Sequence, residues 1–571
     1  MKNRNRREFL LGAGVTASGV ALGPRLFAGI RMSEPHLTPL EGSSNLAEPT
    51  DRKTMRGLMV DAGRVPESLE YYRRVIEFCA DWKLNTLHFR LADDQGSALR
   101  FASVPDLVVH KNAFRPEQLK SLAEYAQAHG VDLIPELESF GHTGYITRSP
   151  AYAHLLDREA QGTSDFTGVI PVKPETLQLF NELYREITAI FPSSYLHGGC
   201  DEVNWGGSEL SRKALETKTR AQIWAEYLNS LNQIAVGLGK QWIVWGDMVV
   251  RKEPEILGKL AKTIIIMDWN YRDHNSARIR ETLLKVSTNG FRAIGAPGLI
   301  NYKWGARAGT EQLRNIDAYA DAYLEEKDPN SLGVILTNWV PSRYVQNSIW
   351  DGFAYAAVAF NEGTGTAQTA GFRRFVERHY RANWNEVWGE AFQIIYDAAP
   401  SVQERSATNS ASLPLKVPWS TDEQLAAALR TGWAGSNPFT RLRSLLVQLE
   451  PQVLNNLSDF QGFALSVEAF ERLFWREAVV MELAANKPLE RKTTDLLIQG
   501  IAERDQALAE ALSKNWDTGR FPDSIAKSEL VFDLRPKDQL LLQWMQAAQY
   551  SASLASRPEH FYQLLDTAKS A

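Results

Sequence analysis

Cysteine is almost absent from the chain, and basic residues do not outnumber acidic ones. Only Cys79 and Cys200 occur among 571 residues, so at most one disulfide can form and a disulfide-stapled scaffold is excluded. Cys79 lies on the apolar face of a predicted helix and Cys200 at a probable strand end, so we expect two free, buried thiols. The net charge of −5 provides no basic field to neutralise phosphates, and we therefore expect no nucleic-acid partner.

Long apolar runs are also missing, but a short one follows paired arginines near the N-terminus. The segment Asn5–Leu10 contains the arginine pair, and the Gly- and Ala-rich run 11–22 is too short to span a membrane. This pattern predicts a twin-arginine export signal over residues 1–29, cleaved near Ala28, followed by a linker over 30–51. We therefore expect a periplasmic or secreted protein without a membrane anchor after cleavage.

Short β-branched apolar runs alternate with helix-period segments from Arg56 onward, as in parallel strands joined by crossover helices. Helices are predicted over 67–82 and 115–129. Eight such units over 52–395 predict a closed (β/α)8 barrel. The alternative is a doubly wound open sheet, but no Gly-x-Gly-x-x-Gly follows any predicted strand. The eight predicted strands are Arg56–Ala62, Asn85–Ala92, Val131–Ser139, Tyr195–Val203, Gln241–Val249, Thr263–Tyr271, Phe291–Ile300 and Leu332–Val340.

A change in composition follows the barrel. Residues 401–412 are rich in Ser, Thr, Asn and Gln and are flanked by prolines, which predicts a linker over 396–419. Apolar residues then recur at helical spacing, for example from Phe463 to Met481. We therefore expect a helical domain over 420–571, packed beside the barrel.

Catalytic residues of such barrels lie at the C-terminal ends of the strands. In this chain those positions combine many carboxylates with indole rings. Paired carboxylates cleave glycosidic bonds through an oxocarbenium-like transition state, and aromatic faces stack on sugar rings. The pattern indicates a glycosidase. The residues at the predicted strand ends are Asp61, Arg64, His88, Asp93, Asp94, Glu136, Glu138, His142, His197, Asp201, Glu202, Trp245, Asp247, Asp268, Trp269, Tyr302 and Trp339.

Four segments, in chain order, resemble glycoside hydrolase family 20, the exo-β-N-acetylhexosaminidases. They are Gly57–Arg64, the Asp-Asp-Gln segment Asn85–Gly96, the Gly-His segment Pro135–His142, and His197–Val203, which is similar to the family's His-x-Gly-Gly-Asp-Glu signature. The resemblance covers about residues 55–360. It implies an exported, retaining glycosidase that removes terminal β-linked GlcNAc or GalNAc from a glycan or amino-sugar oligosaccharide.

The resemblance also implies the catalytic roles. Glu202 matches the general acid/base, and Asp201 matches the carboxylate that orients the substrate's acetamido group, whose oxygen acts as nucleophile through an oxazolinium intermediate. His142 with Asp93 resembles the family's relay to the catalytic glutamate, in which a buried aspartate holds the imidazole of the histidine. The chemistry requires a neutral Glu202 of raised pKa beside an ionised Asp201. Both side chains can reach one pocket only where the strand ends, because neighbouring strand residues face opposite ways.

Substrate-binding residues are expected around this pair. Arg64 matches the residue that grips the sugar hydroxyls, and Tyr302 matches the tyrosine on the acetamido group. Trp245, Trp269 and Trp339 follow three different strands and are the candidates for the walls of the acetamido pocket.

Several departures from the family pattern bear on specificity. Trp304 occupies the place of an aspartate that holds the outer hydroxyls, Pro341 the place of a glutamate, and Arg90 that of a histidine. A barrel that binds such sugars with little turnover therefore remains the alternative. No His-x-x-x-His or Cys-x-x-Cys spacing exists to make a dedicated site, so we expect no metal and no cofactor.

Overall fold

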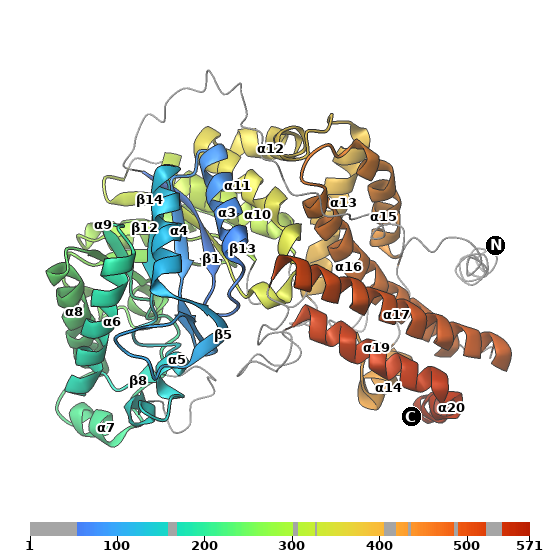
Figure 1. Cartoon of the computed structure of the whole chain (residues 1–571), viewed down its shortest axis with the longest axis horizontal. Coiled ribbons are helices and arrows are strands. Elements are labelled where there is room, and N and C mark those ends of the chain that lie inside the picture. Colours follow the sequence, from blue (N-terminus) through green and yellow to red (C-terminus); the bar gives the residue numbers. More distant parts are fainter. Residues whose placement is uncertain are drawn as a thin grey trace.

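The fold is known from a computed structural model (Figure 1), which describes residues 54–157, 168–300, 307–325, 328–404, 418–431, 436–484, 489–520 and 539–570. The expected export signal, the expected linker over 30–51, and both Tyr302 and Trp304 lie outside these residues. Among the described residues, no helix is long and apolar enough to span a bilayer.

Eight parallel strands form a closed barrel, as predicted. Each strand pairs with the next in chain order, and the first pairs with the last, where Met55 lies opposite Gly333. A short strand, β13 (Gly298–Ile300), follows β12 and also pairs with β14. The barrel strands are β1 (Met55–Asp61), β2 (Thr86–Arg90), β6 (Asp132–Glu136), β9 (Tyr195–His197), β10 (Gln241–Trp245), β11 (Ile265–Asp268), β12 (Arg292–Gly295) and β14 (Ser331–Asn338).

The strands are buried on both faces, as expected for a parallel sheet covered by helices. In β11, Ile265 and Ile266 are fully buried, and burying such a side chain contributes about 1.5–3 kcal/mol. Helices surround the barrel, and the two predicted over 67–82 and 115–129 are confirmed to within two residues. The surrounding helices are α3 (Leu69–Asp81), α4 (Pro116–Ala128), α6 (Pro174–Ile190), α8 (Arg220–Gly237), α9 (Ser276–Thr288), α10 (Thr310–Ala320) and α11 (Trp350–Glu362).

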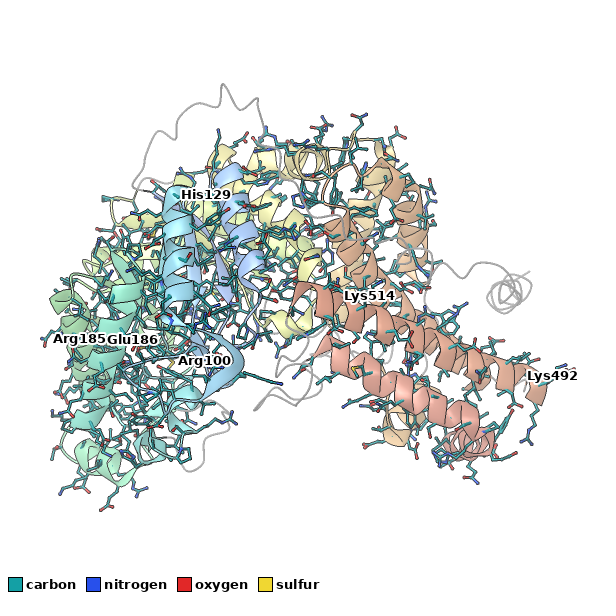
Figure 2. All side chains as sticks on the ribbon, viewed as in Figure 1. Arg100, His129, Arg185, Glu186, Lys492 and Lys514 are labelled. Atoms are coloured by element: carbon teal, nitrogen blue, oxygen red, sulfur yellow. The ribbon has the colours of Figure 1, made fainter. Side chains whose placement is uncertain are left out.

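Local capping explains where these helices begin. Ser68 precedes α3, and its side chain accepts the N–H of Tyr71. Pro116 occupies the first turn of α4, where a missing N–H costs nothing. The carboxylate of Glu186 on α6, labelled in Figure 2, accepts the N–H groups of Ala102 and Ser103 at 2.8 Å each and so ties the loop that contains them to the outer ring of helices.

All eight barrel strands end earlier at the mouth than predicted, as three of them illustrate. The strand predicted through Val203 ends at His197, and the strands predicted through Ser139 and Val249 end at Glu136 and Trp245. The apolar pattern continues beyond each end, but the backbone leaves the sheet. These extra residues form the loops that carry the candidate catalytic side chains.

Helices also make up the C-terminal part, as predicted, but the linker expected over 396–419 begins too early. Helix α13 continues to Glu404, and Tyr396 is buried within it. Lys492 and Lys514 lie on the exposed face of α17 (Figure 2). The helices are α12 (Thr364–His379), α13 (Glu386–Glu404), α14 (Asp422–Thr431), α15 (Pro438–Leu449), α16 (Leu457–Ala484), α17 (Arg491–Gly519), α19 (Leu540–Ser556) and α20 (Pro558–Ser570).

The helical part and the barrel share one hydrophobic core. That core runs from the barrel strands to Phe463 on α16 and Trp544 on α19, while a smaller core involves α14, α16, α17 and α20. The carboxylate of Asp459 on α16 lies 2.7 Å from Arg74 on α3 and 2.8 Å from His379 on α12. The two cysteines are buried and unpaired, as predicted.

Candidate active site

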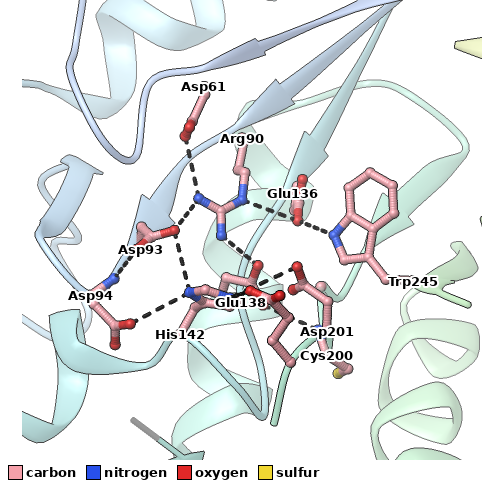
Figure 3. A network of polar contacts seen from close by, with 12 residues as sticks. Asp61, Arg90, Asp93, Asp94, Glu136, Glu138, His142, Cys200, Asp201 and Trp245 are labelled. Atoms are coloured by element: carbon pink, nitrogen blue, oxygen red, sulfur yellow. Dashed lines mark hydrogen bonds and ion pairs between the residues drawn. The ribbon is translucent and has the colours of Figure 1, made fainter. Parts of the chain in front are cut away.

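Polar side chains from five chain segments meet at the C-terminal ends of the strands (Figure 3). Asp61 ends β1, Arg90 ends β2, and Glu136 ends β6. A small sheet of β3 (Ala92–Asp93), β4 (Gly96–Leu99) and β5 (Val109–Phe114) follows β2 and brings Asp93 and Asp94 to the same place. The loop after β9 supplies Asp201 and Glu202. The structure therefore brings together the four residues that the sequence nominated as catalytic.

The loop after β9 has an unusual backbone. Cys200 and Glu202 have φ values of 73° and 45°, and Gly199 has a φ of 65°. A Cβ at Gly199 would lie 2.0 Å from Oε2 of Glu138, so no larger residue fits there. Among the described residues, seven non-glycine residues have positive φ, and His142, Cys200, Glu202 and Val340 at the mouth are four of them. Such strain concentrates at functional sites, and this turn lets both Asp201 and Glu202 face the mouth.

His142 lies between two pairs of carboxylates. Its Nδ1 is 3.4 Å from Oδ2 of Asp94 and 3.7 Å from Oδ2 of Asp93. Its Nε2 is 3.5 Å from Oε2 of Glu202 and 3.8 Å from Oδ2 of Asp201. His142 thus lies between Asp93 and Glu202, as the predicted relay requires, and Asp94 is the nearer of its two aspartates.

The pKa shifts in this cluster differ from the expected order. Burial lowers the pKa of His142, but Asp93 and Asp201 raise it well above its usual value, so the ring is charged at neutral pH. Burial raises the pKa of Glu202, but the hydrogen bond and charge of His142 bring it below its usual value. Burial raises the pKa of Asp201, and the His142 and Arg90 charges only partly offset this effect. The expectation of a raised Glu202 pKa is thus wrong for the free protein, because the imidazolium favours the ionised carboxylate.

Solvent exposure separates the two carboxylates. The Glu202 side chain is 37% exposed, whereas that of Asp201 is 8% exposed. Among the described residues, Oδ1 of Asp201 is a buried acceptor without a hydrogen-bond partner. Oδ2 of Asp247 accepts the N–H of Glu202 at 3.3 Å and so fixes the backbone of that residue. Asp201 can therefore accept a further donor, while Glu202 can reach a leaving group.

Arg90, which replaces a histidine of the family pattern, lies fully buried at the centre of the network (Figure 3). Its guanidinium contacts Glu138 at 2.6 Å, Asp61 at 3.2 Å and Glu136 at 3.4 Å, and it also donates to Asp93. Burial lowers the pKa of Arg90, but these carboxylates raise it well above its usual value. The guanidinium fork thus joins the ends of β1, β2 and β6.

Arg64 is close to the site but is already engaged. Its two terminal nitrogens lie 2.9 Å from Asp61 and 3.0 Å from Asp93, and the side chain is 12% exposed. Its guanidinium also packs 5.2 Å from the ring centroid of Trp339. Arg64 is therefore held in one orientation before any sugar binds.

The three candidate tryptophans differ in exposure. Trp245 and Trp339 are both buried, with 1% and 7% of their surface exposed, and their ring centroids lie 5.6 Å apart. Nε1 of Trp245 donates to Glu136 at 2.8 Å. Trp269 is half-buried and stacks on Tyr271 at 5.0 Å. Trp339 and Trp269 are thus both linked to Tyr271, because the Tyr271 hydroxyl accepts Nε1 of Trp339 at 2.7 Å.

Tyr271 is the main residue that the sequence argument overlooked. It lies just past the end of β11, two residues after Trp269, and its hydroxyl also accepts the hydroxyl of Thr337 at 3.2 Å. Burial raises the pKa of Tyr271, the hydrogen bonds with Thr337 and Trp339 offset part of this rise, and the charges of Asp201 and Glu202 add to it. The Thr337 hydroxyl also donates to the carbonyl of Pro297 at 2.9 Å, so the donor that Tyr271 accepts in full is the indole N–H of Trp339. Tyr271 follows the same strand end as Trp269 and could have been identified from the sequence in the same way.

Residues of the barrel interior resemble a metal site but do not fit a cation. His88, Glu136 and His197 bring ligand atoms within 4.8 Å of one another. However, Nδ1 of His197 accepts the N–H of Gly199 at 3.0 Å, so the neutral ring carries its hydrogen on Nε2 and cannot ligate there. Arg90 already provides positive charge at Glu136. The lack of a metal therefore remains our expectation.

Two other clusters of possible ligands both contain His142. Its raised pKa keeps the imidazole protonated at neutral pH, and a protonated ring has no lone pair for a metal. The arrangement is therefore better suited to proton transfer than to metal binding.

Comparisons with known proteins agree with this geometry. The sequence model of the catalytic domain of glycosyl hydrolase family 20 matches residues 54–327. A beta-hexosaminidase of Vibrio furnissii is 26% identical over 279 residues, which cover 43% of each chain. Beta-hexosaminidase subunit alpha of Bos taurus is 26% identical over 265 residues, or 43% of this chain and 48% of the bovine one.

A solved structure, the GH20 exo beta-N-acetylglucosaminidase of Vibrio harveyi in complex with N-acetylglucosamine, is 21% identical with a TM-score of 0.44, covering 54% of each chain. This chain spans less than half the length of the curated relatives above. The matched region covers the barrel strands from β1 to β12, ends before β14, and contains Asp201, Glu202 and His142. In this region the chain matches the catalytic domain of glycosyl hydrolase family 20.

Proposed function

We propose that the protein is a retaining exo-β-N-acetylhexosaminidase that removes terminal β-linked GlcNAc or GalNAc from glycans. The observation that carries the proposal is the placement of Asp201 and Glu202 around His142 at the barrel mouth. One carboxylate is buried with a vacant acceptor and the other is partly exposed, which suits two different roles.

The proposed mechanism is substrate-assisted. The acetamido oxygen attacks the anomeric carbon as the glycosidic bond breaks, and Glu202 gives its proton to the leaving oxygen. Oδ1 of Asp201 accepts the acetamido N–H and stabilises the positive charge of the oxazolinium ion. Glu202 then removes a proton from the water that opens this ring, which retains the β configuration.

Tyr271 and the tryptophans would bind the acetamido group. The Tyr271 hydroxyl, which accepts Nε1 of Trp339 and contacts the hydroxyl of Thr337, would donate its hydrogen to the acetamido oxygen. Trp269 and Trp339 offer aromatic faces for the methyl group and the sugar ring. Tyr302, the tyrosine that the resemblance implies, remains a second candidate for this hydrogen bond.

Hydrolysis of aryl β-GlcNAc and β-GalNAc, compared with aryl β-glucoside, tests this function. We expect cleavage of the two acetamido sugars and none of the glucoside, because only the former contain the nucleophile. Asp201→Asn should lower turnover by about 10²-fold or more and weaken binding of a thiazoline analogue of the intermediate. Tight binding of acetamido sugars without hydrolysis would favour the alternative of a sugar-binding barrel, and equally tight thiazoline binding by Asp201→Asn would contradict the mechanism.

We further propose that the protein is exported through the twin-arginine pathway. The paired arginines at positions 6 and 7 support this, as do two buried thiols that need no oxidation for folding. Replacing both arginines by lysine should retain the protein in the cytoplasm of its bacterial host. Unchanged appearance of both forms outside the cytoplasm would contradict the proposal.

A further inference from the structure

Arg520 connects the helical part of the molecule to the mouth of the barrel. It follows the last turn of α17 and is 5% exposed. Its Nε donates to both carboxylate oxygens of Glu67, at 2.9 and 2.8 Å, and its Nη2 donates to the carbonyl of Pro341 at 2.7 Å. One guanidinium thus binds two barrel loops, one after β1 and one after β14.

These two loops carry candidate sugar-binding residues. Arg64 lies three residues before Glu67, and Trp339 lies two residues before Pro341. The loops also meet directly, because the N–H of Val340 donates to Oδ2 of Asp61 at 3.0 Å. Val340 has a φ of 52°, a strained conformation for a β-branched residue that the surrounding contacts must maintain.

The surrounding contacts come largely from the helical part. The amide nitrogen of Gln346, in the 3-10 turn η6 (Gln346–Ser348), donates to Glu67 at 2.7 Å and to the carbonyl of Gly519 at 2.9 Å. Helix α16 packs closely on the same turn, where a Cβ at Gly462 would lie 2.7 Å from Cβ of Asn347. The loop after β14 is therefore enclosed by α16 and the end of α17.

We infer that Arg520 is a positioning residue through which the helical domain holds Arg64 and Trp339 in their sugar-binding orientation. The inference rests on the proposed function for its catalytic consequence, but not for the loop contacts themselves. Burial raises the pKa of Glu67, and Arg520 only partly offsets this rise. Loss of Arg520 alone would therefore leave a poorly compensated buried carboxylate, and a test must change both partners.

The chain offers a matched control inside the helical domain. Arg476 on α16 forms a buried ion pair with Asp505 on α17 and donates to the carbonyl of Trp419 at 2.6 Å. Both pairs join a guanidinium to a carboxylate away from solvent. Only the pair of Glu67 and Arg520 connects to barrel loops, so a comparison separates loop positioning from a general loss of stability.

The experiment compares Glu67→Gln/Arg520→Met with Arg476→Met/Asp505→Asn in the full chain. With an aryl β-GlcNAc substrate, we expect the first double variant to lose about 10- to 100-fold in kcat/KM, mainly through KM, because Arg64 and Trp339 bind sugar. The control variant should keep kcat/KM within about twofold. Arg520→Lys, which keeps the charge near Glu67 without the planar fork, should fall between wild type and the first variant.

Hydrogen exchange gives a readout independent of catalysis. Amides of residues 62–68 and 339–346 should exchange faster in Glu67→Gln/Arg520→Met and at the wild-type rate in the control variant. Unchanged exchange in these segments, or equal kinetic losses in both double variants, would overturn the inference. If Glu67→Gln/Arg520→Met fails to fold, Arg520→Lys decides by the same two measurements. An inactive wild type would refute the proposed function, while the exchange measurement would still test the positioning role.

Discussion

Replacing Arg90 by Gln should destabilise the protein strongly at neutral pH. The side chain is fully buried and contacts Asp61, Asp93, Glu136 and Glu138. Removing one partner of a buried ion pair costs about 3–5 kcal/mol. Because four carboxylates lose compensation together, we expect a loss near the upper value, about 5 kcal/mol, against a typical total of about 5–15 kcal/mol.

The loss should shrink as pH falls. Burial raises the pKa of Asp93, but Arg64 and Arg90 lower it well below its usual value. A lowered carboxyl pKa contributes stability above the pKa of the unfolded chain, and this contribution disappears as pH falls through the folded value. In Arg90→Gln the carboxylates lose a cation and their pKa values rise, so protonation relieves the penalty. The difference in stability between wild type and variant should therefore be largest near pH 7 and smaller near pH 4.

Urea unfolding followed by circular dichroism at pH 7 and pH 4 measures this difference. Arg476→Gln is the matched control, because Arg476 is equally buried but has one carboxylate partner, Asp505. Burial lowers the pKa of Arg476 despite that partner, so its charge is less well compensated and its loss should cost less. Equal losses in the two variants, or a loss for Arg90→Gln that does not depend on pH, would refute the reasoning.

Three further predictions concern single residues of the site. Glu202→Gln should lower kcat/KM about 10²- to 10⁴-fold on substrates with poor leaving groups and far less on dinitrophenyl glycosides, since acid assistance matters less there; equal losses on both would exclude Glu202 as the acid. Tyr271→Phe should leave the indole N–H of Trp339 unpaired, cost about 1–3 kcal/mol in thermal unfolding and weaken thiazoline binding; undiminished binding would show that another residue holds the acetamido oxygen. Burial and Asp201 raise the pKa of Asp247 to about 6. The folded state thus binds this proton more tightly, and the contribution of Asp247 to wild-type stability should fall by roughly 3 kcal/mol as pH rises from about 4 to about 6. Asp247→Asn should flatten that dependence, and an unchanged slope would contradict the assignment.

The barrel could be predicted from sequence because its signal is local. Each strand is a run of residues buried on both faces, and each is followed by a helix whose cap or proline marks its beginning, as at Ser68 and Pro116. The ends of the strands were less predictable. Apolar residues such as Leu137 and Val203 remain buried after the strand has ended, so the pattern does not distinguish a strand from a buried loop.

The site was predictable where the chemistry depends on adjacent residues. Asp201 and Glu202 stand next to each other in a motif, and their convergence required only that β9 end before them. The partners of Arg90 and the bond from Arg520 to Glu67 depend on contacts between segments far apart in the chain. The order of pKa values also required the three-dimensional positions of His142 and its four carboxylates, which is why the sequence argument assigned it incorrectly.

The pH dependence of catalysis should reveal that the free protein is not yet in its reactive protonation state. A general acid must be protonated, but His142 favours the ionised form of Glu202 in the free protein. A bound sugar would cover the 37% of the Glu202 side chain that is exposed, and this desolvation raises its pKa. Because kcat/KM reports the free protein and kcat reports the complex, the basic limb of kcat should lie at higher pH than that of kcat/KM, by about one unit or more. His142→Asn removes the imidazolium and should bring the two limbs closer together. Coincident limbs in the wild type, measured with an uncharged aryl glycoside, would mean that substrate binding does not protonate Glu202 and that the proton is supplied by another group.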